Sequence, residues 1–231
     1  MNTTTLKRQE LKYYINFIDY FNISSVISKI FSKDPNNDKN GAYYIRSLYF
    51  DNKSNQDYYQ KIEGEEKRKK FRIRIYNFNS SPIKLEIKSK FNNYIIKKSL
   101  VISTGDANKI ISGNYNNLLN YGDAVAMNVY KEFLKDFYRP VILIDYRREA
   151  YNYNLNQIRI NFDSQIKKRE INLSDLFIND NNTFPVLNNN KIIMEIKFYG
   201  CIPTWIKNLL QLPRFERCAI SKYTLSRYME G

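Results

Sequence analysis

The chain has 231 residues and carries 37 Lys and Arg against 23 Asp and Glu, which gives a formal net charge of +14. Such an excess of cations favours an anionic partner: nucleic acid, an acidic membrane surface or a polyphosphorylated small molecule. Because the chain has no histidine, histidine-metal sites and the usual Ser-His and Cys-His catalytic pairs are excluded.

Cysteine content and hydropathy indicate the compartment. Two cysteines, Cys201 and Cys218, are too few for a disulfide framework and indicate thiols in a reducing cytoplasm. The N-terminus has no apolar signal segment, and no run approaches the ~18 apolar residues of a membrane span. The abundance of Asn, Lys, Ile and Tyr is typical of a low-GC bacterial genome. We therefore expect a soluble protein of the bacterial cytoplasm.

The first hundred residues are expected to mix strands with helices. Apolar side chains close to helical spacing predict a helix over 16–31, with Asn16 as a candidate N-cap. The polar segment 34–41 predicts a loop. Strands are expected at 7–15, 43–51 and 93–102, and a short helix at 54–62.

The stretch 71–90, FRIRIYNFNSSPIKLEIKSK, predicts a hairpin that turns at residues 79–82. Side chains two apart on a strand share a face, so alternate residues starting at Phe71 and Ile83 build an apolar face. The opposite face carries five cations and one carboxylate: Arg72, Arg74, Lys84, Lys88, Lys90 and Glu86. Charges of mostly one sign, regularly phased, are unlike those of an ordinary surface strand.

The second half of the chain is expected to open with helices and to return to strands. Thr104 is a candidate cap for a short helix, and residues 121–138 predict a longer one. Its apolar stripe comprises Val125, Val129, Phe133 and Phe137. Strands are expected at 141–151, 157–163 and 191–200, a loop at 179–190, and helical segments from Pro203 and from about Ser221.

Two short patterns recur along the chain. Arg-Ile-x-(Ile/Phe) starts at Arg72 and at Arg159, each time upstream of a (Leu/Met)-Glu-Ile-Lys. This is a faint twofold repeat, and no Pro/Gly/Ser linker separates the halves, so we expect one domain over 1–231. Glu-x-Lys occurs three times on expected strands, as Glu10/Lys12, Glu86/Lys88 and Glu195/Lys197.

The charged strand faces can be interpreted in two ways. One is an ordinary sheet whose basic outer face lies in water. The other is an α+β fold in which a closed antiparallel β-barrel of about eight strands has its helices packed outside and its charges inside. Like charges ~4 Å apart cost several kcal/mol at an effective dielectric near 20, so such a bore requires a bound polyanion. Glutamates among the cations then indicate Mg²⁺ or Mn²⁺ bridging to phosphates.

An ordered set of motifs points to a family. RQELKYYI, SLYFDN, FRIRIY, LEIKSK, YRREAY, IRINFD, MEIKFYG and SKY run in this order from residue 8 to residue 223. Together they resemble the VTC domain, the polyphosphate polymerase branch of the triphosphate tunnel metalloenzymes, a group that includes the CYTH enzymes. The resemblance implies a closed antiparallel tunnel that binds a nucleoside triphosphate and a divalent metal.

The resemblance also implies roles for basic residues. The phosphate-binding set that it assigns to the catalytic site is Lys12, Arg72, Arg74, Lys88, Arg148, Arg159 and Lys222. Further candidates for substrate binding are Lys61, Lys97 and Lys197. Arg147 adjoins Arg148 and would face the other way on a strand, and the spacing Arg-x-Ala-(Tyr/Phe) favours Arg148.

Three glutamates are the candidate metal ligands. Glu195 matches the metal-binding glutamate of the family, and the cofactor implied is Mn²⁺ or Mg²⁺. Glu10 and Glu86 match acidic tunnel positions that help to hold metal or water in related branches. Each of the three could instead form ion pairs with lysines on neighbouring strands.

The implied function is an ATP-polyphosphate phosphotransferase. The γ-phosphate of ATP passes to the end of a growing inorganic polyphosphate chain, and ADP is released. Two alternatives are open: a tri/polyphosphatase or nucleoside triphosphatase that uses the same tunnel, and a non-catalytic sensor of polyphosphate or inositol polyphosphates. Nucleic-acid binding is disfavoured because the cations are phased along strands and no nucleic-acid motif appears. A separate membrane partner is left open.

Overall fold

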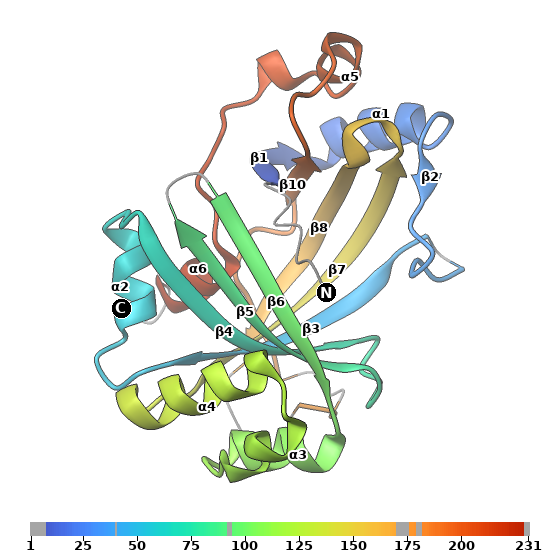
Figure 1. Cartoon of the computed structure of the whole chain (residues 1–231). Helices are drawn as coiled ribbons and strands as arrows, with labels where there is room; N and C mark the ends of the chain where they lie inside the picture. The colour runs from blue at the N-terminus through green and yellow to red at the C-terminus, as the bar shows by residue number, and fades with distance from the viewer. Residues whose placement is uncertain (1–7, 40, 92–93, 170–175, 179–181, 229–231) are drawn as a thin grey trace. The chain divides into compact units, whose positions relative to one another are not determined.

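The protein is described by a computed structural model that divides into two compact units (Figure 1). The described residues are 8–39, 41–91, 94–169, 176–178 and 182–228. The first unit comprises 1–44, 146–166 and 185–221, and the second comprises 45–145, 167–184 and 222–231. Predicted segments fall outside the described residues at 7, 40, 93 and 179–181. That 1–231 acts as one domain stays a prediction.

The first unit is built on long antiparallel strands. β1 (Gln9–Asn16) pairs with β10 (Lys191–Phe198), and β10 pairs with β8 (Ile158–Arg169). The next strand in the order is β7 (Arg139–Tyr153), which both units share. Two short strands lie off this path: β2 (Ser32–Lys33) on β7 and β9 (Phe184–Pro185) on β8.

Helices cover the apolar side of these strands in the first unit. α1 (Phe17–Ile27) begins after Asn16, whose side-chain oxygen accepts the Asp19 N–H at 2.8 Å, so the predicted cap is confirmed. Buried residues of α1 and α5 (Thr204–Leu209) join one apolar core with residues of β8 and β10. Two short 3-10 turns complete the unit: η2 (Leu155–Gln157) and η3 (Leu212–Arg214).

The second unit contains the predicted hairpin. β4 (Lys67–Tyr76) and β5 (Ile83–Phe91) pair antiparallel, which confirms the strands expected within 71–90. They are flanked by β3 (Tyr43–Asp51) on one side and β6 (Tyr94–Ile102) on the other. Two short helices carry predicted basic residues: α2 (Gln56–Ile62) follows β3, and α6 (Lys222–Tyr228) lies near the C-terminus.

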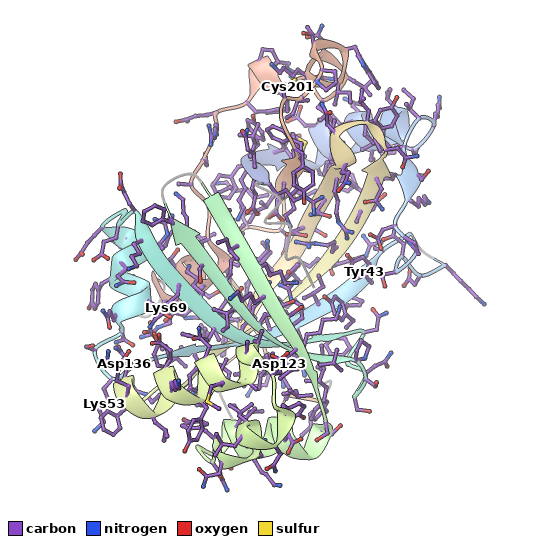
Figure 2. All side chains as sticks on the ribbon, viewed as in Figure 1. Tyr43, Lys53, Lys69, Asp123, Asp136 and Cys201 are labelled. Atoms are coloured by element: carbon purple, nitrogen blue, oxygen red, sulfur yellow. The ribbon has the colours of Figure 1, made fainter. Side chains whose placement is uncertain are left out.

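A second apolar core lies beneath this part of the sheet. α3 (Thr104–Ile111), η1 (Asn116–Tyr121) and α4 (Ala124–Asp136) pack on one face of the β4, β5 and β6 strands (Figure 1). Lys69 of β4 pairs with Glu132 and, at 3.8 Å, with Asp136 of α4; Lys69 and Asp136 are labelled in Figure 2. With the helices on this face, the cations of the hairpin occupy the other one.

Two local predictions for these helices are wrong. Ser103 rather than Thr104 caps α3, because its Oγ accepts the Asp106 N–H at 3.0 Å. Phe137 lies outside the apolar stripe, with 72% of its surface exposed. α4 ends at Asp136 and Phe137 takes a left-handed conformation (φ 54°), which turns its side chain away from the core.

The strands follow one hydrogen-bonded path, β1-β10-β8-β7-β3-β4-β5-β6. The fold is therefore α+β, with a mostly antiparallel sheet and packed helices, as predicted. The path ends at β1 and β6, and no ladder joins these two strands within the described ranges, so a closed barrel is not confirmed. No helix in the described part of the chain is long and apolar enough to cross a membrane.

Candidate functional site

On the second unit, strand register gathers charged side chains into rows. Arg72 lies opposite Tyr49 on one side and opposite Glu86 on the other. Arg74 lies in the next row, between Ser47 and Lys84. Because side chains at successive even positions share a face, both arginines and Glu86 lie opposite the helix-covered side.

Glu86 is the centre of this charged face. Its carboxylate is 1% exposed and accepts a 2.7 Å hydrogen bond from Arg72 Nε, with Arg72 Nη2 at 2.6 Å. Arg74 Nη1 lies 4.0 Å away, and Lys97 Nζ forms a further ion pair. Burial opposes ionisation of Glu86, but the arginines and Lys97 outweigh it and hold its pKa well below the ordinary range. These contacts favour Glu86 as an anchor that orients the cations.

A row of lysines lies beside Glu86. Lys88 of β5 is directly opposite Lys70 of β4 and Lys97 of β6. Side chains in such positions are about 5 Å apart at Cβ, and like charges there repel. Lys61 and Lys222 belong to the same unit, on α2 and at the first residue of α6. The second unit thus supplies six of the ten predicted basic residues.

On the first unit, the Glu-x-Lys pairs of β1 and β10 lie opposite each other, so that each glutamate faces a lysine of the other strand. Glu10 of β1 lies opposite Lys197 of β10, and Lys12 lies opposite Glu195. Lys12 Nζ is 3.3 Å from Glu10 Oε1 and 3.9 Å from Glu195 Oε1, and it donates a 3.0 Å hydrogen bond to the Ile220 carbonyl. Lys197 Nζ is 3.3 Å from Glu195 Oε1. Both lysines therefore share the Glu195 carboxylate.

Arg148 of β7 contacts the same glutamate. Its guanidinium binds Asp163 through two hydrogen bonds, Nε at 2.6 Å and Nη2 at 2.7 Å, and reaches Glu195 Oε2 at 3.2 Å. Burial disfavours the charge on Arg148, but Asp163 outweighs it and raises the pKa of Arg148 well above its ordinary value. Arg147 is half-buried on the opposite face of β7. Arg148 is thus the one of the two arginines that contacts Glu195, and its role in phosphate binding stays a prediction.

Arg159 of β8 completes the first-unit face. Its Nη1 lies 2.5 Å from Asp34 Oδ2, and its Nη2 donates to Tyr43 OH at 3.0 Å. Arg159 Nε donates to Asn161 Oδ1 at 3.1 Å, and Asn161 Nδ2 reaches Glu195 Oε2 at 3.4 Å. Arg159 is thus held by three neutral or acidic partners in a fixed orientation.

Lys197 differs from the other cations of this face. Burial lowers the pKa of Lys197 to about 7, with Glu10 opposing the shift and Arg148 and Lys12 adding to it. Because this pKa lies close to neutral pH, a nearby anion readily shifts the lysine to its protonated form. An incoming phosphate would therefore favour the protonated form of Lys197.

The metal prediction can be tested against the donor atoms. Carboxylate oxygens suit Mg²⁺ and Mn²⁺, and Glu10 and Glu195 lie on neighbouring strands around Lys12 Nζ. In the described part of the chain, no group of three or more His, Cys, Asp or Glu is arranged to hold a metal. A divalent ion held by these two carboxylates would need its remaining ligands from phosphate and water. Their role as ligands stays a prediction.

Sequence reasoning missed the acidic partners of these cations. Asp163 and Asp34 are buried and pair with Arg148 and Arg159. Asp163 had a usable signal, because it is two residues beyond Asn161 and four beyond Arg159, and so lies on the same strand face. Asp34 had none, since it belongs to a polar loop that reaches Arg159 through tertiary structure.

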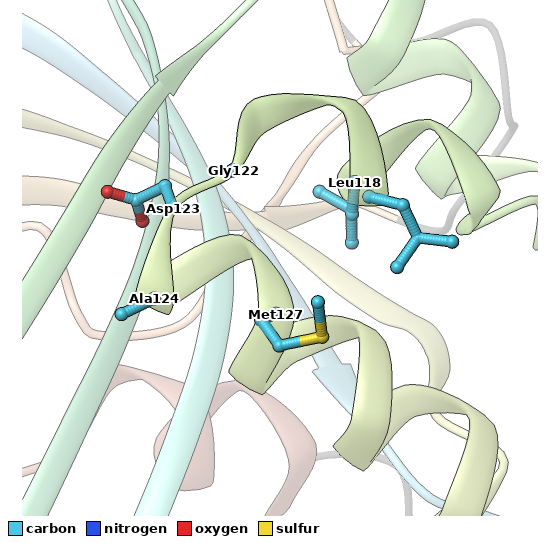
Figure 3. A pocket seen from close by; sticks show the side chains of 6 residues that line it. Leu118, Gly122, Asp123, Ala124 and Met127 are labelled. Atoms are coloured by element: carbon cyan, nitrogen blue, oxygen red, sulfur yellow. The ribbon is translucent and has the colours of Figure 1, made fainter.

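A pocket of about 310 Å³ lies at the start of α4, among residues of η1 and α4 (Figure 3). It is lined mainly by apolar side chains, and its one carboxylate, Asp123, already caps α4 by accepting the Val125 N–H at 2.6 Å. No cation lines it, so it is unsuited to phosphate. The lining residues are Leu118, Leu119, Gly122, Asp123, Ala124 and Met127.

Comparison with solved structures finds the same fold in a distant protein. A structure described as a "putative adenylate cyclase" from Bacillus halodurans shares 12% identity, covers 94% of this chain and 96% of its own, and has a TM-score of 0.51. The PH1819 protein of Pyrococcus horikoshii, also at 12% identity, covers 96% and 99%, with a TM-score of 0.49. No curated protein matches the sequence.

The sequence itself matches one protein family. The family described as the VTC domain covers residues 7–229, which is nearly the entire chain and includes both charged faces. This agrees with the resemblance carried by the motifs from RQELKYYI to SKY. The chain belongs to the VTC domain family.

Proposed function

We propose that this protein is a metal-dependent polyphosphate polymerase. It transfers the γ-phosphate of ATP to the end of a growing inorganic polyphosphate chain and releases ADP. The substrates are ATP and polyphosphate, the cofactor is Mn²⁺ or Mg²⁺, and the proposed compartment is the bacterial cytoplasm.

One observation carries this proposal: both units of a VTC-family chain bear strand-borne cations grouped around a buried glutamate. In the second unit Glu86 gathers Arg72, Arg74 and Lys97. In the first unit Glu195 gathers Arg148, Lys12 and Lys197. Preorganised cations of this kind stabilise the charge that develops on phosphoryl oxygens during transfer.

The chemistry requires little beyond positioning. The arginines bind non-bridging phosphate oxygens through paired N–H groups, and the lysines supply point charges. A divalent ion held at Glu195 and Glu10 would neutralise charge between the β- and γ-phosphates. The acceptor, a polyphosphate end, is already deprotonated, so no strong general base is needed and the lack of histidine is no obstacle.

Incubation with ATP and Mn²⁺ tests the proposal. Gel electrophoresis should show long chains that a polyphosphatase degrades, together with an equivalent amount of ADP. Glu195→Gln should lower the rate at least about a hundredfold because it removes the carboxylate charge. Glu216→Gln, an exposed position in the same unit, is the matched control and should keep full activity.

Other products would indicate other functions for the same residues. Orthophosphate without polymer would indicate a tri/polyphosphatase or nucleoside triphosphatase. Tight binding of tripolyphosphate without turnover in any divalent metal would indicate a sensor. Full polymerase activity in Glu195→Gln would contradict the metal assignment.

A further inference from the structure

Asp51, the last residue of β3, joins three elements of the second unit. The buried carboxylate accepts the N–H groups of Asn52 at 2.9 Å and of Asp57 at 3.0 Å through Oδ1. Its Oδ2 accepts the Tyr58 N–H at 3.0 Å and the Tyr223 hydroxyl at 2.5 Å. The start of α2 and the start of α6 are thereby tied to the end of β3.

Tyr223 continues the connection to the charged face. Its ring stacks on that of Tyr49, with centroids 5.2 Å apart and planes at 22°. Tyr49 OH accepts a 3.1 Å hydrogen bond from Arg72 Nη1, and the Arg72 guanidinium lies 5.8 Å from the Tyr49 ring centroid. A continuous set of contacts therefore runs from Asp51 through Tyr223 and Tyr49 to Arg72.

The two tyrosines are placed to support Arg72 and cannot stack on a ligand base. Tyr49 is 6% exposed and Tyr223 is 1% exposed, so neither ring presents a face to solvent. Burial, and then the neighbouring Asp51, raise the pKa of Tyr223 far above its ordinary value, so its hydroxyl remains a donor at all physiological pH values.

We propose that Tyr49, Asp51 and Tyr223 are positioning residues that hold Arg72 in its phosphate-binding orientation. The proposal rests on the proposed function, because it assigns these residues to the same site. Glu86 fixes one side of the Arg72 guanidinium and Tyr49 fixes the other. An arginine side chain carries ~2 kcal/mol of rotamer entropy, and fixing it before the ligand arrives removes that cost from binding.

The same connection reaches two predicted lysines. Lys222 immediately precedes Tyr223 at the start of α6, and Lys61 lies in the last turn of α2, whose first turn is held by Asp51. Lys70 Nζ lies 5.0 Å from the Tyr223 ring centroid. The hydrogen bond between Tyr223 and Asp51 thus joins the SKY and SLYFDN segments of the sequence. The cations next to this connection belong to α2, α6 and β4.

Removal of single hydroxyl groups tests the proposal without disturbing packing. Tyr49→Phe and Tyr223→Phe should each weaken tripolyphosphate binding about five- to twentyfold in titration calorimetry, as expected for loss of support to a charged hydrogen bond. KM for ATP should rise by a similar factor, with kcat changed less. Tyr59→Phe, an exposed tyrosine of α2, is the control and should bind as the original protein does.

A double-mutant cycle separates positioning from general stability. In an Arg72→Ala background, Tyr49→Phe should change tripolyphosphate affinity less than twofold, because it acts through the missing guanidinium. An equal loss in both backgrounds, or wild-type affinity in Tyr49→Phe, would overturn the proposal even if polymerase activity is found. Tripolyphosphate binding that follows this cycle without polymer formation would contradict the proposed function alone. No binding by the original protein would overturn both.

Discussion

Asp57 is a carboxyl group that folding places in an unfavourable environment. It is 1% exposed, Tyr138 OH donates to its Oδ1 at 2.9 Å, and its Oδ2 has no hydrogen-bond partner in the described part of the protein. Burial, and then the nearby Asp51, raise the pKa of Asp57 to about 7, against partial opposition from Tyr138, Lys69 and Lys70. Ionisation of this side chain must therefore destabilise the folded protein.

The sign of this effect predicts how stability depends on pH. Between the ordinary pKa of an aspartate and about 7, the folded state binds more protons than the unfolded state, so stability falls as pH rises. Asp57→Asn keeps the acceptor for Tyr138 and removes the charge. It should raise the free energy of unfolding at pH 8 by a few kcal/mol and have a much smaller effect at pH 4.

Urea unfolding at the two pH values measures this difference. Glu66→Gln, at an exposed position of the same unit, should show no such pH dependence and serves as the control. An identical change in stability for Asp57→Asn at pH 4 and pH 8 would show that the native carboxyl does not titrate in this range.

At the scale of elements, strands β4, β5 and β6 carry an imbalance of charge around Glu86. The single carboxylate contacts Arg72, Arg74 and Lys97, while Lys88 lies directly opposite both Lys70 and Lys97. Removing one partner of a buried ion pair leaves the others uncompensated and typically costs ~3–5 kcal/mol. The three strands therefore depend on Glu86 when no anion is bound.

Glu86→Gln should thus lower Tm by roughly 10 °C without ligand. Tripolyphosphate should raise Tm more in this variant than in the original protein, because the bound anion replaces the missing negative charge. Differential scanning fluorimetry with and without tripolyphosphate gives both numbers. Equal ligand-induced shifts in the two proteins would indicate that the anion does not bind at this face.

The sequence could predict which segments form strands and which side chains share a face, because alternation of apolar and polar residues is a local signal. Residues 71–90 form the expected hairpin, and all three Glu-x-Lys pairs lie on strands. Register was not predictable, and it differs between the two copies of the repeat. Arg72 lies opposite Glu86, whereas Arg159 lies opposite Lys197 and Asn161 lies opposite Glu195. The arginine that contacts Glu195 is instead Arg148, on another strand.

Partners brought by tertiary structure were equally invisible in the sequence. Asp34 reaches Arg159 from a loop, and Tyr223 reaches Asp51 from the end of the chain. Helix ends also depended on single side chains, since Ser103 takes the cap position and Tyr138, rather than Phe137, stacks on Phe133 at 5.1 Å. Neither choice follows from apolar spacing.

At the scale of the molecule, each unit has a hydrophobic core of its own among the described residues. Phe133 is fully buried in the core of the second unit and packs against Phe50 and Phe71. Phe133→Ala should cost ~3–5 kcal/mol through lost burial and cavity formation. Hydrogen exchange should rise first in β4, β5, β6 and α4 of that unit.

The matched variant is Phe162→Ala, which removes a ring from the core of the first unit. It should raise exchange first in β1, β8 and β10. Uniform exchange throughout the chain in either variant would show that the two cores unfold as a single cooperative unit.

The crossed Glu-x-Lys pairs of β1 and β10 have a consequence for folding. A slip of two residues keeps every side chain on its own face, so hydrophobic patterning alone does not reject it. Such a slip would set Glu10 opposite Glu195 or, in the other direction, Lys12 opposite Lys197, whereas the native register sets each glutamate opposite a lysine. The charges proposed to bind phosphate therefore also disfavour the wrong register of β1 on β10 before any ligand is present.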